Sequence, residues 1–324
     1  MEEKVLNIFT WFFVSSSILN LSNSFMLGES NREIRLGLHK FLLEQPKSRF
    51  KTNFDQYDEL CEQLQPQIID NHIELKKKTV RKPNYYKKKV HCSFEENNGL
   101  IEALSIISDT FGLYGKEGGA AVRATINRPI IESLEGRSHS RKIKIAVLGS
   151  GPGIDALYLL QALPAELRKN IHIDCFDLSE GFIAAGMSFL PDKLKEIDMD
   201  PSQLCFHLAD ITDSEFRNNF SDYDISTICF ALHEMPKEMQ EKTIKNACSM
   251  ARQTSILEID KEKWKKTHNF FATMSFEITE PFWKDLDKEF IASMLEKHSE
   301  YCSELDQCEE AQTLSSVFGL MSHN

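Results

Sequence analysis

The chain has 324 residues, and its 41% hydrophobic and 27% charged content is that of an ordinary soluble globular protein. This length is enough for about two domains. The net charge of −11 argues against a general nucleic-acid binder, because neutralising phosphate groups requires a positive protein surface.

Residues 1–75 show helical patterns throughout. One helical face near the N-terminus carries the apolar side chains Val5, Ile8, Phe9, Phe12 and Phe13, which predicts a packed helix. A cleaved signal and an interfacial anchor are the alternatives. Glu2, Glu3 and Lys4 do not make a basic signal region, and polar residues interrupt the apolar run. The segment is also too polar for a membrane span, so we expect none.

A basic segment follows at 76–89, where eight Lys or Arg residues surround Tyr85 and Tyr86. We interpret it as a solvated linker. Contact with RNA or an anionic surface is the alternative, since aromatic side chains between cations can stack on bases. Further helical patterns continue beyond it. We therefore predict an N-terminal helical domain over 1–135, with this linker inside it, and a second domain over 136–324.

Residues 142–155 are the most informative stretch of the chain. An apolar run over 143–149 leads into glycines at alternate positions, Gly149, Gly151 and Gly153, and a helical pattern follows over 155–163. This order predicts a buried parallel strand, a sharp turn and a helix. Glycines in the turn permit positive φ angles and let backbone N–H groups approach a ligand.

Further strand patterns alternate with helical segments, at 170–177, 204–209, 224–232 and 255–260. This alternation predicts a doubly wound α/β fold with a mostly parallel sheet. Ligands of such sheets bind beyond the carboxyl ends of the strands, and polar residues follow these strands. Asp177 lies 24 residues after Gly153, near the roughly 20-residue interval at which a carboxylate meets a ribose.

From about residue 142 to 260 the chain resembles the class I S-adenosylmethionine-dependent methyltransferases, which have a Rossmann-like fold. The resemblance implies S-adenosyl-L-methionine as cofactor, with the glycine loop beside its amino-acid part. Asp177 would bind the ribose hydroxyls, and Asp210 with Ile211 would face the adenine. The full set of implied cofactor-binding residues is Gly149, Ser150, Gly151, Gly153, Asp177, Leu178, Asp210, Ile211 and Phe230.

The sequence departs from the family pattern two residues before Gly149. The family usually has an acid there, and this chain has Val147, which puts the details of methionine binding in doubt. A nicotinamide- or flavin-binding fold is the competing interpretation. The third glycine of its Gly-x-Gly-x-x-Gly fingerprint would fall at Ile154, so the fingerprint is incomplete.

The resemblance also implies an enzyme whose methyl-transfer site is lined by residues 231–234. His233 and Glu234 are therefore the candidate catalytic residues. In one interpretation His233 takes a proton from the acceptor; in the other it holds the loop, while Glu234 caps the helix that starts near Pro236. We expect a small-molecule acceptor. Residues 230–236 are loosely similar to methyltransferases acting on aromatic or quinone-like compounds, but so few residues do not assign the substrate. A protein or RNA methyltransferase, and a binding protein without catalysis, are the alternatives.

Eight cysteines are spread along the chain without a Cys-x-x-Cys pair or a visible disulfide framework. We therefore expect no metal site and a reducing, cytoplasmic location. Near the C-terminus the sequence predicts a helix at about 281–301 and one strand-like run over 313–320. The last strands of the catalytic domain are accordingly expected to be shortened or absent.

Overall fold

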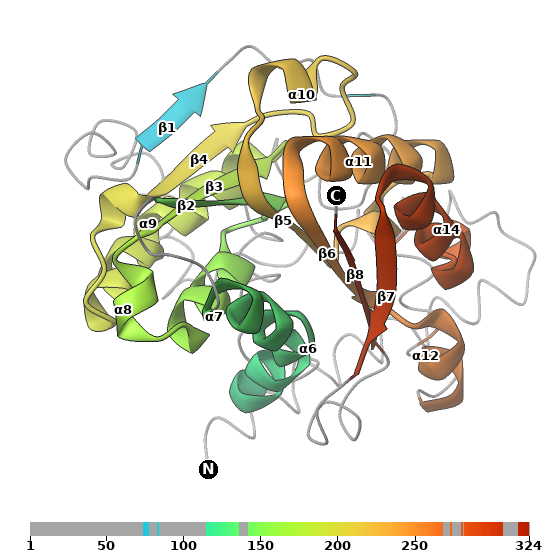
Figure 1. Cartoon of the computed structure of the whole chain (residues 1–324), viewed down its shortest axis with the longest axis horizontal. Helices are drawn as coiled ribbons and strands as arrows, with labels where there is room; N and C mark the ends of the chain where they lie inside the picture. Colours follow the sequence, from blue (N-terminus) through green and yellow to red (C-terminus); the bar gives the residue numbers. More distant parts are fainter. Residues whose placement is uncertain are drawn as a thin grey trace, which may run out of the picture.

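The structure is a computed structural model, and the residues that it describes are 74–77, 83, 115–135, 142–267, 273, 280, 282–306 and 317–323. They form one eight-stranded sheet with helices on both faces (Figure 1). The strands are β1 (Glu74–Lys77), β2 (Ile143–Leu148), β3 (Ile171–Asp177), β4 (Leu204–Leu208), β5 (Tyr223–Cys229), β6 (Ala251–Ile259), β7 (Tyr301–Leu305) and β8 (Val317–His323).

The described helices flank this sheet. They are α6 (Gly115–Glu135), α7 (Ile154–Ala162), α8 (Ala165–Arg168), α9 (Glu180–Glu196), α10 (Phe216–Asn219), α11 (Lys237–Met250), α12 (Lys261–Thr267) and α14 (Lys288–His298). Three short 3₁₀ turns, η3 (Pro201–Gln203), η4 (Leu232–Glu234) and η5 (Trp283–Asp285), lie between the larger elements. The alternation of strands and helices confirms the predicted α/β class.

The strand order is β1-β4-β3-β2-β5-β6-β8-β7, and β1 to β6 are mutually parallel. The order reverses at β2, because the chain moves outward to β3 and β4 and then returns to β5 on the other side. Such a reversal is the place where open α/β sheets bind ligands, beyond the carboxyl ends of the strands.

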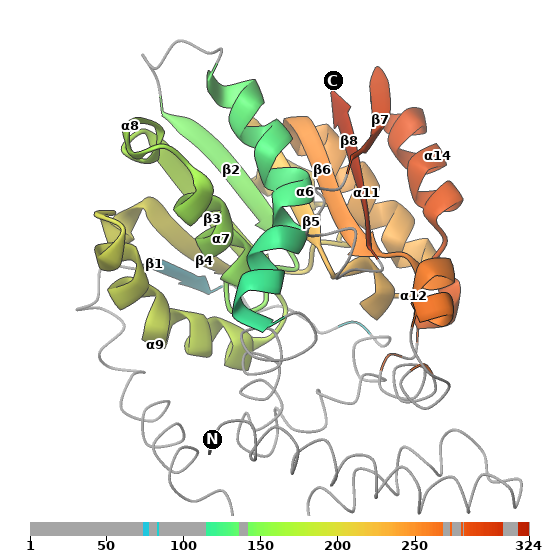
Figure 2. The same cartoon turned by 90° about the horizontal axis from the view of Figure 1, so that it is seen from below.

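Two layers of apolar side chains hold the helices to the sheet. Residues of α7, α8 and α9 pack on one face with β2, β3 and β4, and residues of α11 and α14 pack on the other. Helix α6 lies beside α7 and packs on β5 and β6 through Val122 and Ile126, which contact Cys229 and Leu257 (Figure 2). The predicted strands are therefore buried on both faces, which explains their continuous apolar runs.

Two predictions about strands are wrong. Residues 74 and 75 were predicted as helix and residues 76 and 77 as linker, but 74–77 form β1, a parallel edge strand beside β4. The C-terminal strands are present as an antiparallel pair, with β8 between β6 and β7. The helix predicted at 281–301 is also present, but it is shorter and forms α14. Its N-cap residue is Asp287, whose carboxylate accepts a hydrogen bond from Phe290 N–H.

The first 73 residues lie outside the described residues, and so do most of residues 78–114. The packed helix predicted near the N-terminus and the linker after residue 77 are among them, apart from Pro83. The division into domains at residue 135 therefore stays a prediction. Among the described helices, none has the length and apolar content needed to cross a membrane.

Candidate functional site

The glycine loop connects β2 to α7 in the geometry that the sequence predicts. Gly149, Gly151 and Gly153 have φ angles of 65°, 51° and 81°, a region that residues with a Cβ rarely adopt. A Cβ built on Gly153 would lie 2.8 Å from Leu190 Cδ1, so this glycine permits close packing on α9. A Cβ built on Gly151 would have no atom of the described residues within 4 Å, so this part of the structure leaves space in front of the loop.

Asp177 ends β3 and holds the glycine loop directly. Its Oδ2 accepts a hydrogen bond from Gly151 N at 2.8 Å, and its Oδ1 accepts one from Ser179 N at 2.8 Å. Ser179 in turn caps α9, because its hydroxyl accepts from Phe182 N. A carboxylate oxygen can accept more than one hydrogen bond, so the side chain of Asp177 has the chemistry to bind a ligand diol.

The other predicted cofactor residues follow neighbouring strands at the same edge of the sheet. Asp210 and Ile211 follow β4, and a Cβ on Gly149 would lie 3.8 Å from Ile211 Cδ1 and 2.6 Å from Ala231 Cβ. The loops after β2, β4 and β5 are thus in contact. Asp210 Oδ1 accepts hydrogen bonds from the amide and hydroxyl of Thr212, which fixes its turn.

The remaining loop residues are held by the neighbouring elements. Ser150 is buried and its N–H donates to Phe176 O at 3.0 Å, while Leu178 is buried next to Asp177. Phe230 follows β5 with a φ of 52°, and its N–H donates to Leu257 O at 2.9 Å. A non-glycine residue at positive φ costs free energy, so the surroundings must stabilise Phe230 in this position.

Arg123 of α6 supplies part of that support. Its guanidinium lies 5.5 Å from the Phe230 ring and 4.8 Å from the Tyr158 ring, and it forms an ion pair with Asp155 in the first turn of α7. Arg123 is 3% exposed, so this pair is shielded from solvent. These contacts therefore fix α6 against α7, the helix that follows the glycine loop, and against the end of β5.

His233 and Glu234 lie in the 3₁₀ turn after β5, and a buried carboxylate organises this turn. Glu258 of β6, with 0% exposure, accepts from His233 Nδ1 at 2.8 Å and from Leu232 N at 2.9 Å. It also accepts from the backbone N–H of His233 and of Ile259.

The charge of Glu258 changes the acid–base behaviour of His233. Burial alone would lower the pKa of this imidazole, but the nearby carboxylates, Glu258 above all, raise it to about 9. His233 is therefore protonated at neutral pH and donates from Nδ1 to Glu258. A protonated imidazole cannot accept a proton, so the geometry favours the loop-holding interpretation over the general base.

The same turn brings together a group of possible metal ligands. One ligand atom each from His233, Glu234 and Glu280 lies within 4.8 Å of the others. His233 Nδ1 contacts Glu258, and metal-binding histidines commonly have their second ring nitrogen engaged by a carboxylate in this way.

Sequence reasoning missed Glu258 and Arg123. Each had a signal, because each is an ionisable residue within an apolar pattern: Glu258 lies between Leu257 and Ile259 in a buried strand, and Arg123 follows Val122 on the buried stripe of α6. A charge at such a position must be paired to be tolerated. The partners themselves were not readable, since they come from distant parts of the chain.

Comparisons with known proteins identify the fold. No family model and no curated protein matches the sequence. The chain is similar to the crystal structure of the CurJ carbon methyltransferase, with 15% identity, a TM-score of 0.52, and coverage of 83% of this chain and 70% of that one. It is also similar to an O-methyltransferase family protein from Burkholderia thailandensis, with 11% identity, a TM-score of 0.50, and coverage of 90% and 71%.

At such low identity a structural likeness is a statement about the fold. It agrees with the topology, in which a glycine loop follows the central strand β2 and an antiparallel strand closes the sheet beside β6. The chain has the fold of the class I S-adenosylmethionine-dependent methyltransferases.

Proposed function

We propose that the protein is a methyltransferase that uses S-adenosyl-L-methionine and acts on a small-molecule acceptor. The observation that carries this proposal is the hydrogen bond from Gly151 N to Asp177 Oδ2, next to the open space in front of Gly151. This hydrogen bond joins the glycine loop, whose backbone a ligand can approach, to the carboxylate of Asp177, which can accept hydrogen bonds from a diol. Both lie where the strand order reverses.

The residues present fit this cofactor. Among the residues that the structure describes, none has an atom within 4 Å of a Cβ on Gly151, as a cofactor lying against the loop requires. Asp177 would accept from the ribose hydroxyls, and the apolar side chains of Leu178, Ile211 and Phe230 would line the adenine. When bound, the cofactor supplies a methyl group on a sulfonium, which is already activated for transfer. Two residues before Gly149, where the family usually has an acid, this chain has Val147, which is buried in β2. This position therefore offers the cofactor no carboxylate.

The protein's own contribution is positioning. Orienting two reactants can supply about 7–11 kcal/mol of the barrier reduction. Glu258 holds the turn at Leu232 and His233, and Arg123 holds Phe230, so both buried charges fix backbone beside the proposed transfer site. We propose that His233 is a positioning residue with Glu234 beside it, and that the acceptor does not give its proton to His233.

The glycine loop offers a matched pair of variants. We expect Gly151→Ala to fold, at a cost of about 1–2 kcal/mol for its positive φ, and to bind S-adenosylhomocysteine at least about tenfold more weakly, a loss of about 1.4 kcal/mol. Gly153→Ala should instead lose about 2–4 kcal/mol of stability, because its Cβ would lie 2.8 Å from Leu190. Calorimetry and thermal unfolding check both. Normal binding by Gly151→Ala would contradict the assignment of the loop.

The role of His233 is separable from general-base catalysis. We expect His233→Gln to keep turnover per folded molecule within a few-fold of wild type at saturating cofactor, because the wild-type imidazole is already protonated. A general base would instead contribute about 10²–10⁴-fold. Turnover measured from pH 6 to 8 should show no imidazole-dependent step. A large defect in the folded variant would overturn the positioning role.

A macromolecular acceptor, protein or RNA, is the second candidate. Lys76 and Lys77, the first two residues of the basic segment 76–89, belong to β1, and Lys77 is opposite Leu208, two residues before Asp210. Replacing Lys87, Lys88 and Lys89 by serine leaves β1 intact and separates the candidates. With a small-molecule acceptor, turnover should not change; with an RNA acceptor, turnover should fall together with its salt dependence.

The acceptor's identity needs a screen with labelled cofactor. The structural neighbours are a carbon methyltransferase and an O-methyltransferase family protein, so aromatic and quinone-like compounds with carbon or oxygen acceptors are the first set to test. The net charge of −11 favours a small acceptor over a nucleic acid. We also propose a cytoplasmic location, because the spacing of the eight cysteines in the sequence shows no disulfide framework.

A further inference from the structure

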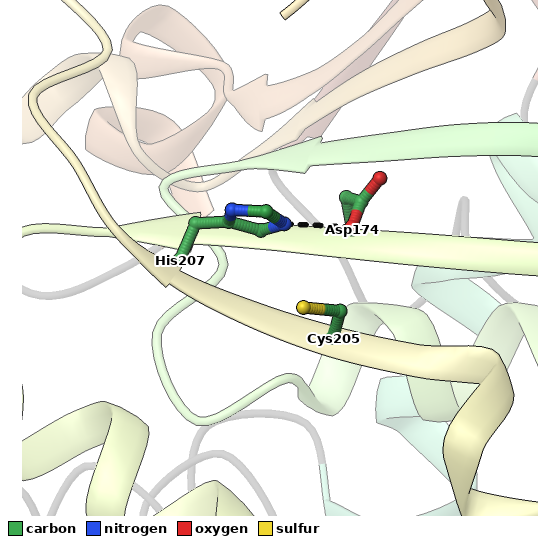
Figure 3. Close-up of side chains that lie close together, drawn as sticks. All are labelled: Asp174, Cys205 and His207. Atoms are coloured by element: carbon green, nitrogen blue, oxygen red, sulfur yellow. Dashed lines mark hydrogen bonds and ion pairs between the residues drawn. The ribbon is translucent and has the colours of Figure 1, made fainter. Parts of the chain in front are cut away.

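A second cluster of ligand-type side chains lies on β3 and β4, away from the proposed cofactor site. The two strands are parallel, with Asp174 opposite Cys205 and Phe176 opposite His207. Side chains alternate between the faces of a strand, so Asp174, Cys205 and His207 share one face, and Asp177 points to the other. Figure 3 shows these three side chains side by side. One ligand atom from each lies within 4.8 Å of the others.

The carboxylate of Asp174 is the centre of this cluster. Its Oδ1 lies 2.7 Å from His207 Nε2 and 3.4 Å from His172 Nε2, and its Oδ2 accepts from the Tyr223 hydroxyl at 2.7 Å. These contacts orient the carboxylate of Asp174 within the cluster.

We propose that Asp174, Cys205 and His207, with His172 as fourth ligand, form a binding site for a zinc-type divalent cation. Carboxylate, thiolate and imidazole are the ligands that zinc uses, and two anions with two neutral imidazoles balance its charge in a buried site. From metal–ligand bonds of about 2.0–2.3 Å, tetrahedral ligand atoms lie about 3–4 Å apart. The ligand atoms of Asp174, Cys205 and His207 lie within 4.8 Å of one another, and His172 Nε2 lies 3.4 Å from Asp174 Oδ1.

The surroundings of the cluster match those of a structural metal site. The Tyr223 hydroxyl engages Oδ2, which leaves Oδ1 directed at the histidines, and such outer contacts orient metal ligands. The His207 ring is stacked on Phe176 at 4.6 Å and has Phe220 edge-on at 5.1 Å, so its orientation is fixed. The His172 side chain is 28% exposed and gives the cation a route from solvent.

The proposed cation would stabilise the fold and does not take part in methyl transfer. It would join β3 to β4 three residues before Asp177 and Asp210, on the opposite face from Asp177. Binding releases the thiol proton of Cys205 to solvent, because the thiolate is the ligand form.

Cobalt(II) is the probe that tests the site, because a bound thiolate gives a charge-transfer band that oxygen and nitrogen ligands do not. The reduced, chelator-treated wild-type protein should bind one cobalt per chain with this band, and zinc should displace it. A hundredfold excess of zinc over its Kd should raise Tm by about 5 °C. A wild-type protein without the band would overturn the proposal.

Variants assign the band to this cluster. Cys205→Ser should lose it, whereas Cys175→Ser, an equally buried cysteine on the other face of β3, should keep it. Tyr223→Phe should keep the band and weaken cobalt binding about 10–100-fold, as expected for an outer-shell partner. A band that persists in Cys205→Ser would overturn the site. If that variant does not fold, His172→Gln decides, because unchanged cobalt affinity there would equally overturn it.

Discussion

Asp177→Ala is expected to weaken S-adenosylhomocysteine binding by at least about 100-fold. Hydrogen bonds to a charged group contribute about 1.5–3 kcal/mol each, and two bonds to the ribose would be lost. The same substitution removes the acceptor for Gly151 N, so the loop also loses its anchor to β3. Calorimetry on the folded variant measures the change in affinity.

Two comparisons make this result specific. Asp192→Ala removes an acid of α9 whose side chain is 81% exposed, and it should leave cofactor affinity unchanged. Asp210→Ala should weaken binding less than Asp177→Ala, because Ile211 keeps its apolar contact with the adenine. An Asp177→Ala protein that is folded and binds normally would remove the basis for the proposed cofactor site.

Glu258→Ala is expected to destabilise the fold by about 3–5 kcal/mol, the usual cost of removing one partner from a buried ion pair. The loss leaves the His233 imidazolium without its counter-charge and the Leu232 and His233 amides without an acceptor. Glu262→Ala, whose side chain is 71% exposed on α12, is the control and should stay within about 0.5 kcal/mol of wild type. Denaturant unfolding measures both, and equal stabilities would contradict this account.

The same pair makes stability depend on pH. The pKa of His233 is raised from 6.5 to about 9 in the folded state, so its contribution is fully present below pH 6.5 and is lost as the pH rises through about 9. The free energy of unfolding should fall by about 3 kcal/mol across that window. In His233→Gln this fall should be largely absent. A variant with the wild-type pH dependence would show that another group titrates.

The central sheet could be predicted because the sequence of each strand reflects its burial. Ile143 to Leu148 is an apolar run because β2 is buried on both faces, and the glycines after it mark a turn that needs positive φ. The position of the strand-end residues at one edge of the sheet could also be predicted, because parallel strands end at the same edge. That these residues bind the cofactor stays a prediction.

Other features depend on contacts that the local sequence does not contain. β1 is four residues long and is a strand because β4 offers an open edge, while helical patterning and basic residues dominate its neighbourhood. β7 has no buried residue and is defined by its pairing with β8. Glu258 and His233 are 25 residues apart, and their pairing determines whether the imidazole is basic or already protonated.

Titration of the wild-type protein with S-adenosylhomocysteine, followed by S-adenosyl-L-methionine, tests the central claim most directly. The account predicts that each ligand binds one molecule per chain, at a shared site, with affinity that falls sharply in Gly151→Ala and Asp177→Ala. A folded wild-type protein that binds neither ligand, or whose binding is insensitive to both substitutions, would contradict it.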